Sequence, residues 1–154
     1  MKITEVEAIE IRLPEAEILD KASSGQTSLI VKIHTDDGIV GIGEIDSCPR
    51  VAKAAIEAPF SHSVVSGLGR LMTGMNPLDV RVIHEKLYQS TFYYGRRGVV
   101  VQAIGGLDMA LWDIAGKHHQ QPIHQLLGGA FHREFRAYAS ILFGRDGKET
   151  CEIG

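Results

Sequence analysis

The stretch "GGLDMALWDIAGK", residues 105–117, decides the fold of this chain. It places Asp108 and Asp113 within a run of leucine, methionine, alanine, tryptophan and isoleucine. Apolar residues continue around nearly the whole circumference of residues 99–118, a pattern that predicts a long buried helix. A carboxylate in apolar surroundings is costly unless it is paired or hydrogen-bonded. The stretch therefore raises the question whether the two aspartates carry chemistry or belong to the scaffold.

The spacing of the two aspartates favours the scaffold. They stand five positions apart, about 140° around a helix axis, so they do not share a face as a carboxylate acid/base pair would. Asp113 precedes Lys117 by four residues, the favourable order for a helical ion pair, whereas we expect Asp108 to accept hydrogen bonds from the backbone or from an arginine. Gly105 and Gly106 each cost roughly 1 kcal/mol relative to alanine. We expect another element to approach the helix closely there.

The segments before this helix predict an antiparallel meander. Residues 2–13 alternate between apolar and polar side chains as a half-buried strand does, with one slip near residues 8–9 that suggests a β-bulge. Residues 27–34 and 39–45 flank an Asp-Gly pair at residues 37–38, a strong hairpin signal. The run "GIVGIGE" lacks the GxGxxG order of a dinucleotide site. Its glycines favour a strand that packs closely against a neighbour.

A helical layer is predicted after the meander. We expect a short helix over residues 50–58, ended by a proline, and a weaker helix over residues 61–74. A clear helix follows, with Asn76 as its N-cap and Pro77 at its first position. After the long helix, residues 122–129 predict a short helix with proline at its start and glycine after its end. The fold class is therefore α+β, a three-stranded antiparallel meander packed on helices.

Composition excludes several classes of protein. The net charge of −3 and the lack of a basic stripe argue against nucleic acid as a partner. No apolar run approaches the roughly 20 residues that cross a bilayer, so we expect no membrane partner. The acidic N-terminus has no signal-peptide core. Cys48 and Cys151 make no disulfide framework. These features predict a cytoplasmic protein with free thiols.

The sequence "QAIGGLDMALWDIAGKHHQQPIHQLLGG", residues 102–129, resembles the signature that ends the N-terminal capping domain of the enolase superfamily. The similarity is strongest to the mandelate racemase and muconate lactonizing enzyme branch. The opening strand, the meander ending "DDGIVGIGE" and the helix "NPLDVRVIHEKLY" agree with it. The resemblance implies a capping domain over residues 1–129. It also implies the start of a (β/α) barrel over residues 130–154, with a first barrel strand within "FRAYASILF".

The resemblance further implies a reaction and a cofactor. In this superfamily, one Mg²⁺ held by three barrel carboxylates stabilises the enolate that forms when a proton next to a carboxylate is removed. The bases are lysines or histidines at the ends of barrel strands. We expect these groups beyond Gly154, so no catalytic residue and no metal ligand is assigned within this chain. His118, His119 and His124 do not match a zinc-site spacing.

The resemblance implies a small-molecule carboxylate as substrate, such as a hydroxy acid or an acid sugar. The loop of residues 14–26 would close over the active site, and residues 46–50 would form a second specificity loop. Residues 93–98, "YYGRRG", could bind an anion or bridge cap and barrel. A solvated lysine and a strand hydroxyl bonded to its neighbours are the plainer alternatives for two of the candidates. The candidate substrate-binding residues are Lys21, Ser23, Ser24, Cys48, Arg96, Tyr138 and Ser140.

Two hypotheses about function remain open at the level of sequence. In the first, the chain is the N-terminal, lid-forming part of a Mg²⁺-dependent racemase, cycloisomerase or dehydratase, and residues 1–154 alone are inactive. In the second, the chain is a stand-alone, non-catalytic binding or scaffold module that oligomerises through the face that the barrel would cover. We expect a homo-oligomer.

Overall fold

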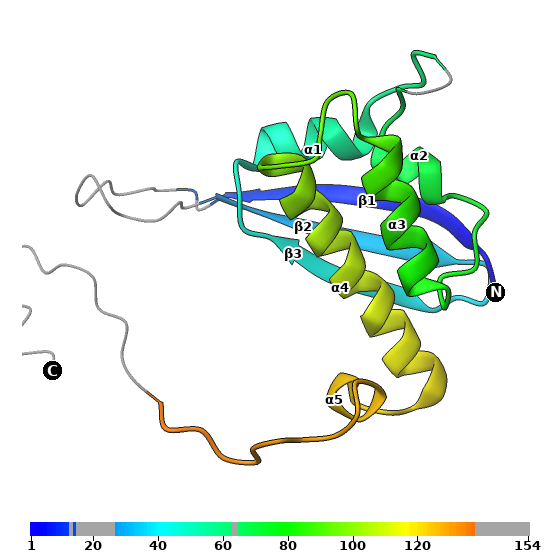
Figure 1. The fold of residues 1–154 in the computed structure, drawn as a ribbon. Coiled ribbons are helices and arrows are strands. Elements are labelled where there is room, and N and C mark those ends of the chain that lie inside the picture. The colour runs from blue at the N-terminus through cyan, green and yellow to red at the C-terminus, as the bar shows by residue number, and fades with distance from the viewer. Residues whose placement is uncertain (13, 15–26, 63–64, 138–154) are drawn as a thin grey trace, which may run out of the picture.

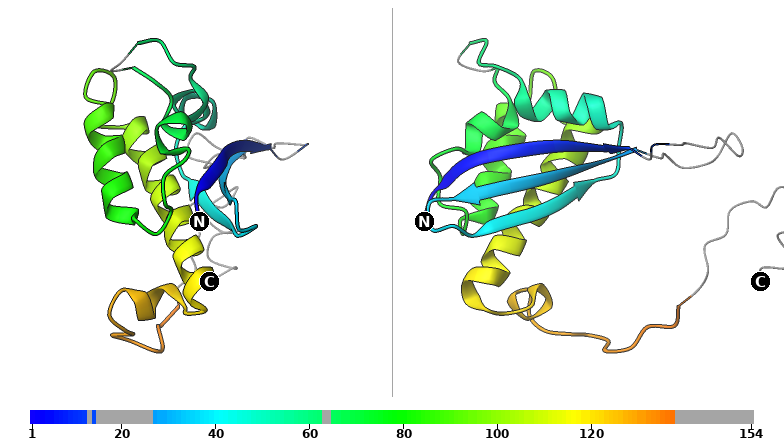
Figure 2. Two further views of the ribbon diagram at one scale, coloured as in Figure 1. Left: turned by 90° about the vertical axis from the view of Figure 1, so that its right-hand side faces the viewer. Right: turned by 180° about the vertical axis from the view of Figure 1, so that it is seen from behind.

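The fold is a three-stranded antiparallel sheet whose one face is covered by helices (Figures 1 and 2). The computed structural model describes residues 1–12, 14, 27–62 and 65–137. The strands are β1 (Ile3–Arg12), β2 (Thr27–Thr35) and β3 (Val40–Ile45), in the order β1-β2-β3. The helices are α1 (Pro49–Glu57), α2 (Leu68–Met72), α3 (Val80–Ser90), α4 (Val99–His119) and α5 (Ile123–Leu126). The α+β meander predicted from the sequence is confirmed.

The core lies between the sheet and the helices. Along β2, Leu29, Val31 and Ile33 are fully buried and alternate with half-buried residues that face the other way. The opposite face of the sheet has no helix over it among the described residues (Figure 2). The alternation of apolar and polar residues along the strands is therefore that of a sheet covered on one side only.

The irregularity in β1 lies at its start and not near residues 8–9, where it was expected. The register of β1 against β2 shifts between Ile3 and Glu5 and is regular from there to Arg12. Ile3 is held by a distant loop, because its N–H donates to Met75 O (2.9 Å) and its carbonyl accepts from Gly74 N–H (2.8 Å). A contact between segments distant in sequence thus sets the position of the bulge.

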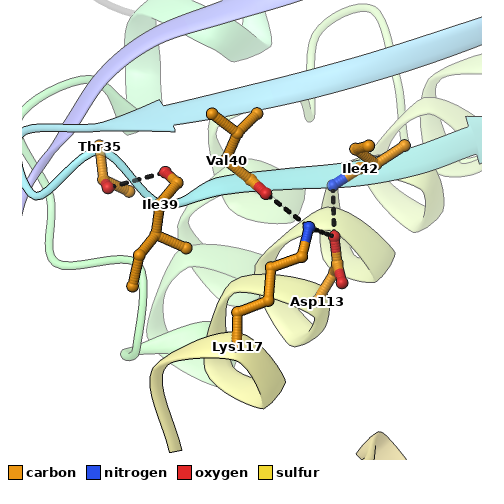
Figure 3. Close-up of polar contacts among 6 residues, drawn as sticks. All are labelled: Thr35, Ile39, Val40, Ile42, Asp113 and Lys117. Atoms are coloured by element: carbon orange, nitrogen blue, oxygen red, sulfur yellow. Dashed lines mark hydrogen bonds and ion pairs between the residues drawn. The ribbon is translucent and has the colours of Figure 1, made fainter. Parts of the chain in front are cut away.

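The hairpin between β2 and β3 forms as the Asp-Gly pair predicts. Gly38 adopts a φ of 81°, and its N–H donates to Thr35 O at 3.1 Å. The Thr35 hydroxyl closes the turn by donating to Ile39 O at 2.8 Å (Figure 3). This local chemistry fixes which residues of the two strands face each other.

The second helix is shorter than predicted. α2 spans only Leu68–Met72, and the expected helix over residues 61–74 is wrong for most of its length. Ser61 N–H instead donates to Val65 O at 3.0 Å, and Gly67 N–H donates to Ala58 O at 3.0 Å. These bonds draw the segment back against the end of α1, which a helix over the same residues could not reach.

The third helix also begins later than predicted, since α3 starts at Val80 and Asn76 is not its N-cap. The Asn76 side chain accepts from Leu78 N–H at 3.2 Å, and the Asn76 carbonyl accepts from Asp79 N–H at 3.1 Å. Asparagine competes for local backbone groups in this way in turns. A turn therefore stands where the sequence predicts the first turn of a helix.

α4 lies against β3 at backbone distance. A Cβ on Gly43 would lie 2.0 Å from Gly106 O, and a Cβ on Gly41 would lie 2.1 Å from Ala110 O. A Cβ on Gly106 would lie 2.3 Å from Ile45 Cγ1. The close packing predicted for the strand glycines and for Gly106 is confirmed.

Two expectations about α4 need correction. No atom lies within 4 Å of a Cβ built on Gly105, so close approach explains only one of the two adjacent glycines. α4 is also not buried on every side, because Val101 and Met109 are exposed.

By length and composition alone, α4 could cross a membrane, contrary to the sequence expectation. More than half of its most apolar window is buried in the fold, which explains that composition by packing.

The chain beyond α4 agrees with the sequence as far as it is described. α5 follows Pro122, and Gly128 and Gly129 after it adopt φ values of 106° and 107°. Residues 130–137 form neither helix nor strand. The predicted barrel strand lies mostly outside the described residues, so the division into a capping domain and a barrel stays a prediction.

The adjacent glycines of α4 give a matched pair of variants. We expect Gly106→Ala to lower the free energy of unfolding by about 2 to 4 kcal/mol, because its methyl group would overlap Ile45. Gly105→Ala should raise it by about 0.5 to 1 kcal/mol, because alanine favours helix and meets no atom. Urea unfolding followed by circular dichroism measures both. Equal effects of the two variants would contradict the packing described.

Candidate functional site

One end of the sheet brings together the connections that the sequence singles out. Arg12, the last residue of β1, pairs with Thr27, the first residue of β2. Leu29 of β2 pairs with Ile45, the last residue of β3, and Cys48 directly precedes α1. Figure 1 shows the chain passing from β3 into α1. The two predicted specificity segments are therefore anchored at the same edge of the fold. We call this edge, defined by Arg12, Thr27 and Ile45, the sheet end.

The described candidates do not come together as one site. Cys48 is an exposed free thiol at the N-cap position of α1, with no hydrogen bond from its side chain. Arg96 is exposed in the loop before α4, with a φ of 71°. Within the described chain, no hydrogen bond or ion pair involves the Arg96 side chain. The other candidates, Lys21, Ser23, Ser24, Tyr138 and Ser140, lie outside the described residues.

Two polar pairs next to the sheet end were missed from the sequence. The Ser28 hydroxyl donates to Glu44 Oε1 at 2.7 Å on the open face of the sheet. Arg50 Nε lies 3.5 Å from Glu10 Oε1 and ties α1 to β1. The hairpin register could have revealed the first pair, because it places β2 residue 28 diagonally across from β3 residue 44. The second pair depends on how α1 packs, for which the sequence has no signal.

Asp113 closes the outer edge of the sheet (Figure 3). Its Oδ2 accepts from Ile42 N–H at 2.8 Å and from Lys117 Nζ at 2.7 Å. The same ammonium donates to Val40 O at 2.7 Å. The predicted ion pair is confirmed, and it binds one N–H and one C=O of those that β3 presents away from β2. These charge-assisted bonds, which we call the edge clamp, protect part of a strand edge that would otherwise be open to other chains.

Asp108 has a different partner from the one predicted. It lies 3.2 Å from His84 Nδ1 of α3, and neither the backbone nor an arginine bonds to it among the described residues. The Asp108 and His84 side chains are 29% and 49% exposed, so water screens the pair. The two aspartates thus contact different elements on different sides of α4, as their angular separation requires.

The groups with shifted pKa values have structural partners. The hydrogen bond with His34 (2.8 Å) lowers the pKa of Glu7, and the N–H of Lys2 (2.6 Å) lowers the pKa of Asp36. Burial raises the pKa of Tyr94. These groups lie on β1, in the hairpin and in the loop before α4, so they do not form an acid/base pair.

The described residues do not fit a Mg²⁺ site. Mg²⁺ takes oxygen ligands, chiefly carboxylates, in octahedral geometry. Across the described ranges, no three side chains of histidine, cysteine, aspartate or glutamate converge as a metal site requires. No step of a metal-assisted reaction can be assigned to them.

A groove with a mainly apolar lining lies on the helical side of the fold. It measures about 410 Å³ and lies between the start of α3, the second half of α4 and α5. Trp112 and Leu126 line it, and Val82 at its rim is 61% exposed. Such an exposed apolar surface is typical of a face that contacts another domain or chain.

The described chain is a small α+β domain, in which a three-stranded antiparallel sheet carries one layer of helices. The family profile described as "Mandelate racemase / muconate lactonizing enzyme, N-terminal domain" matches residues 4–128. The chain belongs to this family, and the resemblance seen in the sequence is confirmed.

Two curated relatives carry different activities in their names. The chain is 36% identical over 113 residues to L-rhamnonate dehydratase of Saccharopolyspora erythraea, which covers 73% of the chain and 27% of that protein. It is 36% identical over 138 residues to N-succinyl-L-Arg/Lys racemase of Bacillus cereus, which covers 88% of the chain and 36% of that protein. The chain therefore spans about a third or less of the length of these relatives.

Solved structures agree with the fold. The 3,6-anhydro-D-galactonate cycloisomerase of Zobellia galactanivorans matches with a TM-score of 0.66 and 30% identity, over 84% of this chain and 32% of that one. A mandelate racemase/muconate lactonizing protein of Paracoccus denitrificans, complexed with magnesium, matches with a TM-score of 0.64 and 30% identity, over 85% and 31%.

Replacing the two aspartates of α4 should have different effects on stability. We expect Asp113→Ala to lower the free energy of unfolding by about 1 to 2 kcal/mol, because Ile42 N–H and Lys117 lose a charged partner. Asp108→Ala should change it by less than about 0.5 kcal/mol, because its pair with His84 is screened by water. Urea unfolding measures both. A larger loss for Asp108→Ala would contradict the edge clamp.

Proposed function

We propose that this chain is the N-terminal part of a Mg²⁺-dependent enzyme that removes the proton α to a carboxylate of a hydroxy acid or acid sugar. The match of residues 4–128 to the family's N-terminal domain carries the proposal. A dehydratase, a racemase and a cycloisomerase are among the proteins it resembles. These reactions differ in their outcome but can all begin by removing a proton next to a carboxylate. The outcome for this protein stays open among the three.

The proposed role of residues 1–129 is to cap the active site. Arg12 and Ile45, from which these two segments leave the sheet, lie at the same end of the sheet, on either side of β2. Segments placed in this way can exclude water and contact the part of the substrate that does not react. Cys48 is the described candidate for such a contact, because it is exposed at this position. We propose the same role for Lys21, Ser23 and Ser24.

Residues outside the capping domain, together with Arg96 within it, complete the proposal. Mg²⁺, when bound, would supply positive charge to the enolate, and we assign its ligands and the bases to barrel segments beyond the described residues. Tyr138 and Ser140 are proposed as substrate contacts from the first barrel strand, and Arg96 as an anion contact or a bridge to the barrel. We further propose that the enzyme is a cytoplasmic homo-oligomer that binds neither nucleic acid nor membrane.

A stand-alone scaffold module is the second candidate function. The groove beside Trp112 and the exposed Val82 favour it, because an apolar surface of this kind calls for a partner. In the first proposal, a barrel covers that surface; in the second, another copy of the chain covers it. The mass of the native protein distinguishes them, since the 154-residue chain has a mass of 16.8 kDa.

Proton exchange tests the proposed division of labour. The purified chain of residues 1–154, incubated in D₂O with Mg²⁺ and L-rhamnonate or other acid sugars, should show no α-proton exchange by NMR. A fusion of residues 1–129 to the C-terminal part of L-rhamnonate dehydratase should exchange the α-proton, because the fusion restores the groups that the cap lacks. Exchange by the chain alone would contradict the proposal.

The fusion also tests Cys48 as a specificity position. Cys48→Trp should raise KM for the acid sugar by about tenfold while changing kcat less, because bulk at the sheet end would obstruct substrate entry and binding. Cys48→Ala serves as the matched control for folding and should keep the melting temperature, because the thiol makes no hydrogen bond as N-cap of α1. An unchanged KM in Cys48→Trp would place Cys48 away from the substrate.

A further inference from the structure

The two outer strands of the sheet are treated differently by the rest of the fold. The outer edge of β3 is bonded to α4 over its first half, where Asp113 and Lys117 bond to Ile42 N–H and Val40 O. The outer edge of β1 has no such cover between Glu5 and Glu10 in the described chain. Unpaired strand edges are templates for pairing with another chain, and natural proteins usually protect them. The uncovered edge of β1 is therefore a candidate interaction surface.

The bond from Ile42 shows in which direction each residue of the sheet presents its backbone. In an antiparallel ladder, the N–H and C=O of one residue point to the same side, and the side alternates along the strand. Ile42 points away from β2, so Gly41 and Gly43 point toward it, where they pair with Ile33 and Val31. Val31 and Ile33 of β2 accordingly point toward β3.

The same alternation continues into β1. Ile30 and Lys32 of β2 point toward β1, where they pair with Ile9 and Glu7 in a regular register. Glu7 and Ile9 therefore point their backbone N–H and C=O groups toward β2. The residues that alternate with them along β1 point these groups away from β2. The residues that present N–H and C=O at the outer edge are Val6, Ala8 and Glu10.

Pairing along this edge has already begun within the chain. Ile3 N–H donates to Met75 O at 2.9 Å, and Gly74 N–H donates to Ile3 O at 2.8 Å. These two bonds show that backbone groups of a turn, at residues 74–75, reach the outer side of β1. They end where the bulge between Ile3 and Glu5 turns the strand. The stretch beyond the bulge continues the same edge.

The edge forms one wall of a groove. Six consecutive residues of β1, residues 5–10, line it, together with Lys53 and Glu57 of α1. The groove has a volume of about 440 Å³, and six residues of a strand extend over about 20 Å. A groove between a strand edge and a helix is the shape that accepts an added peptide strand.

The charge of the groove identifies the kind of segment that fits. Glu5, Glu7, Glu10 and Glu57 supply four carboxylates, whereas Lys53 supplies one ammonium. Lys53 lies 3.5 Å from Glu57, Arg50 lies 3.5 Å from Glu10, and Glu7 bonds to His34 at 2.8 Å. Four carboxylates against the charges of Lys53 and Arg50 leave a moderate acidic excess. The acidic excess repels a second copy of the same edge and attracts lysine or arginine side chains.

We propose that the outer edge of β1 accepts an extended segment of a partner protein that alternates apolar residues with lysine or arginine. The segment adds to the sheet as a fourth strand. Its backbone bonds to Val6, Ala8 and Glu10, and its basic side chains lie near the groove carboxylates. This surface is independent of the proposed proton abstraction.

Binding of a short peptide to the 154-residue chain tests the proposal. The probe is acetyl-Lys-Val-Lys-Val-Lys-Val-amide, titrated by isothermal calorimetry at low salt. The matched peptide, N-methylated at every internal amide, keeps the side chains and the charge but loses the backbone donors. We expect it to bind at least about tenfold more weakly, because several backbone hydrogen bonds are lost. Slowed amide exchange at Val6, Ala8 and Glu10 should accompany binding of the unmodified peptide.

Variants separate the groove from general electrostatic attraction. The double variant Glu5→Gln with Glu57→Gln should weaken binding about fivefold, whereas Glu85→Gln on α3, which removes one carboxylate from another element, should change it less than twofold. Absence of binding, equal affinity for the N-methylated peptide, or a strand pair formed by two copies of the chain would each overturn the proposal.

Discussion

The close contact between β3 and α4 is the constraint on which the rest of this structure depends. Gly43 and Gly106 allow the helix to reach the strand at backbone distance, since a side chain at either position would overlap the opposite element. At that distance, Asp113 and Lys117 reach the backbone groups on the outer edge of β3. The same contact buries the apolar side of α4 on β2 and β3. Both the packing of the core and the protection of the β3 edge therefore depend on the missing side chains of Gly43 and Gly106.

Local chemistry explains which parts of the fold the sequence predicts. The Asp-Gly pair determines its own hairpin, and the apolar pattern of α4 determines a long core helix. The failures depend on contacts between distant segments: the bulge follows from the bonds of Ile3 to Gly74 and Met75. Gly105 and Gly106 look alike in sequence, and only the position of β3 distinguishes them.

The candidate site was predictable only as a location. The strand register places the ends of β1 and β3 and the start of β2 together, and this arrangement follows from the hairpin and the alternation. Pairs such as Glu10 with Arg50 depend on helix packing, which the sequence does not encode locally. The sheet end and the uncovered β1 edge are distinct surfaces. The first serves the proposed cap, and the second offers a place for a partner strand.

Hydrogen exchange at the Ile42 amide tests the dependence on β3 and α4 most directly. An outward-facing amide on an edge strand ordinarily exchanges quickly, because water reaches it. If Asp113 holds Ile42 N–H as described, native-state exchange monitored by NMR should protect this amide to the level of Val31 and Ile33 in the central strand. Exchange of Ile42 as fast as that of an open strand edge would contradict the account.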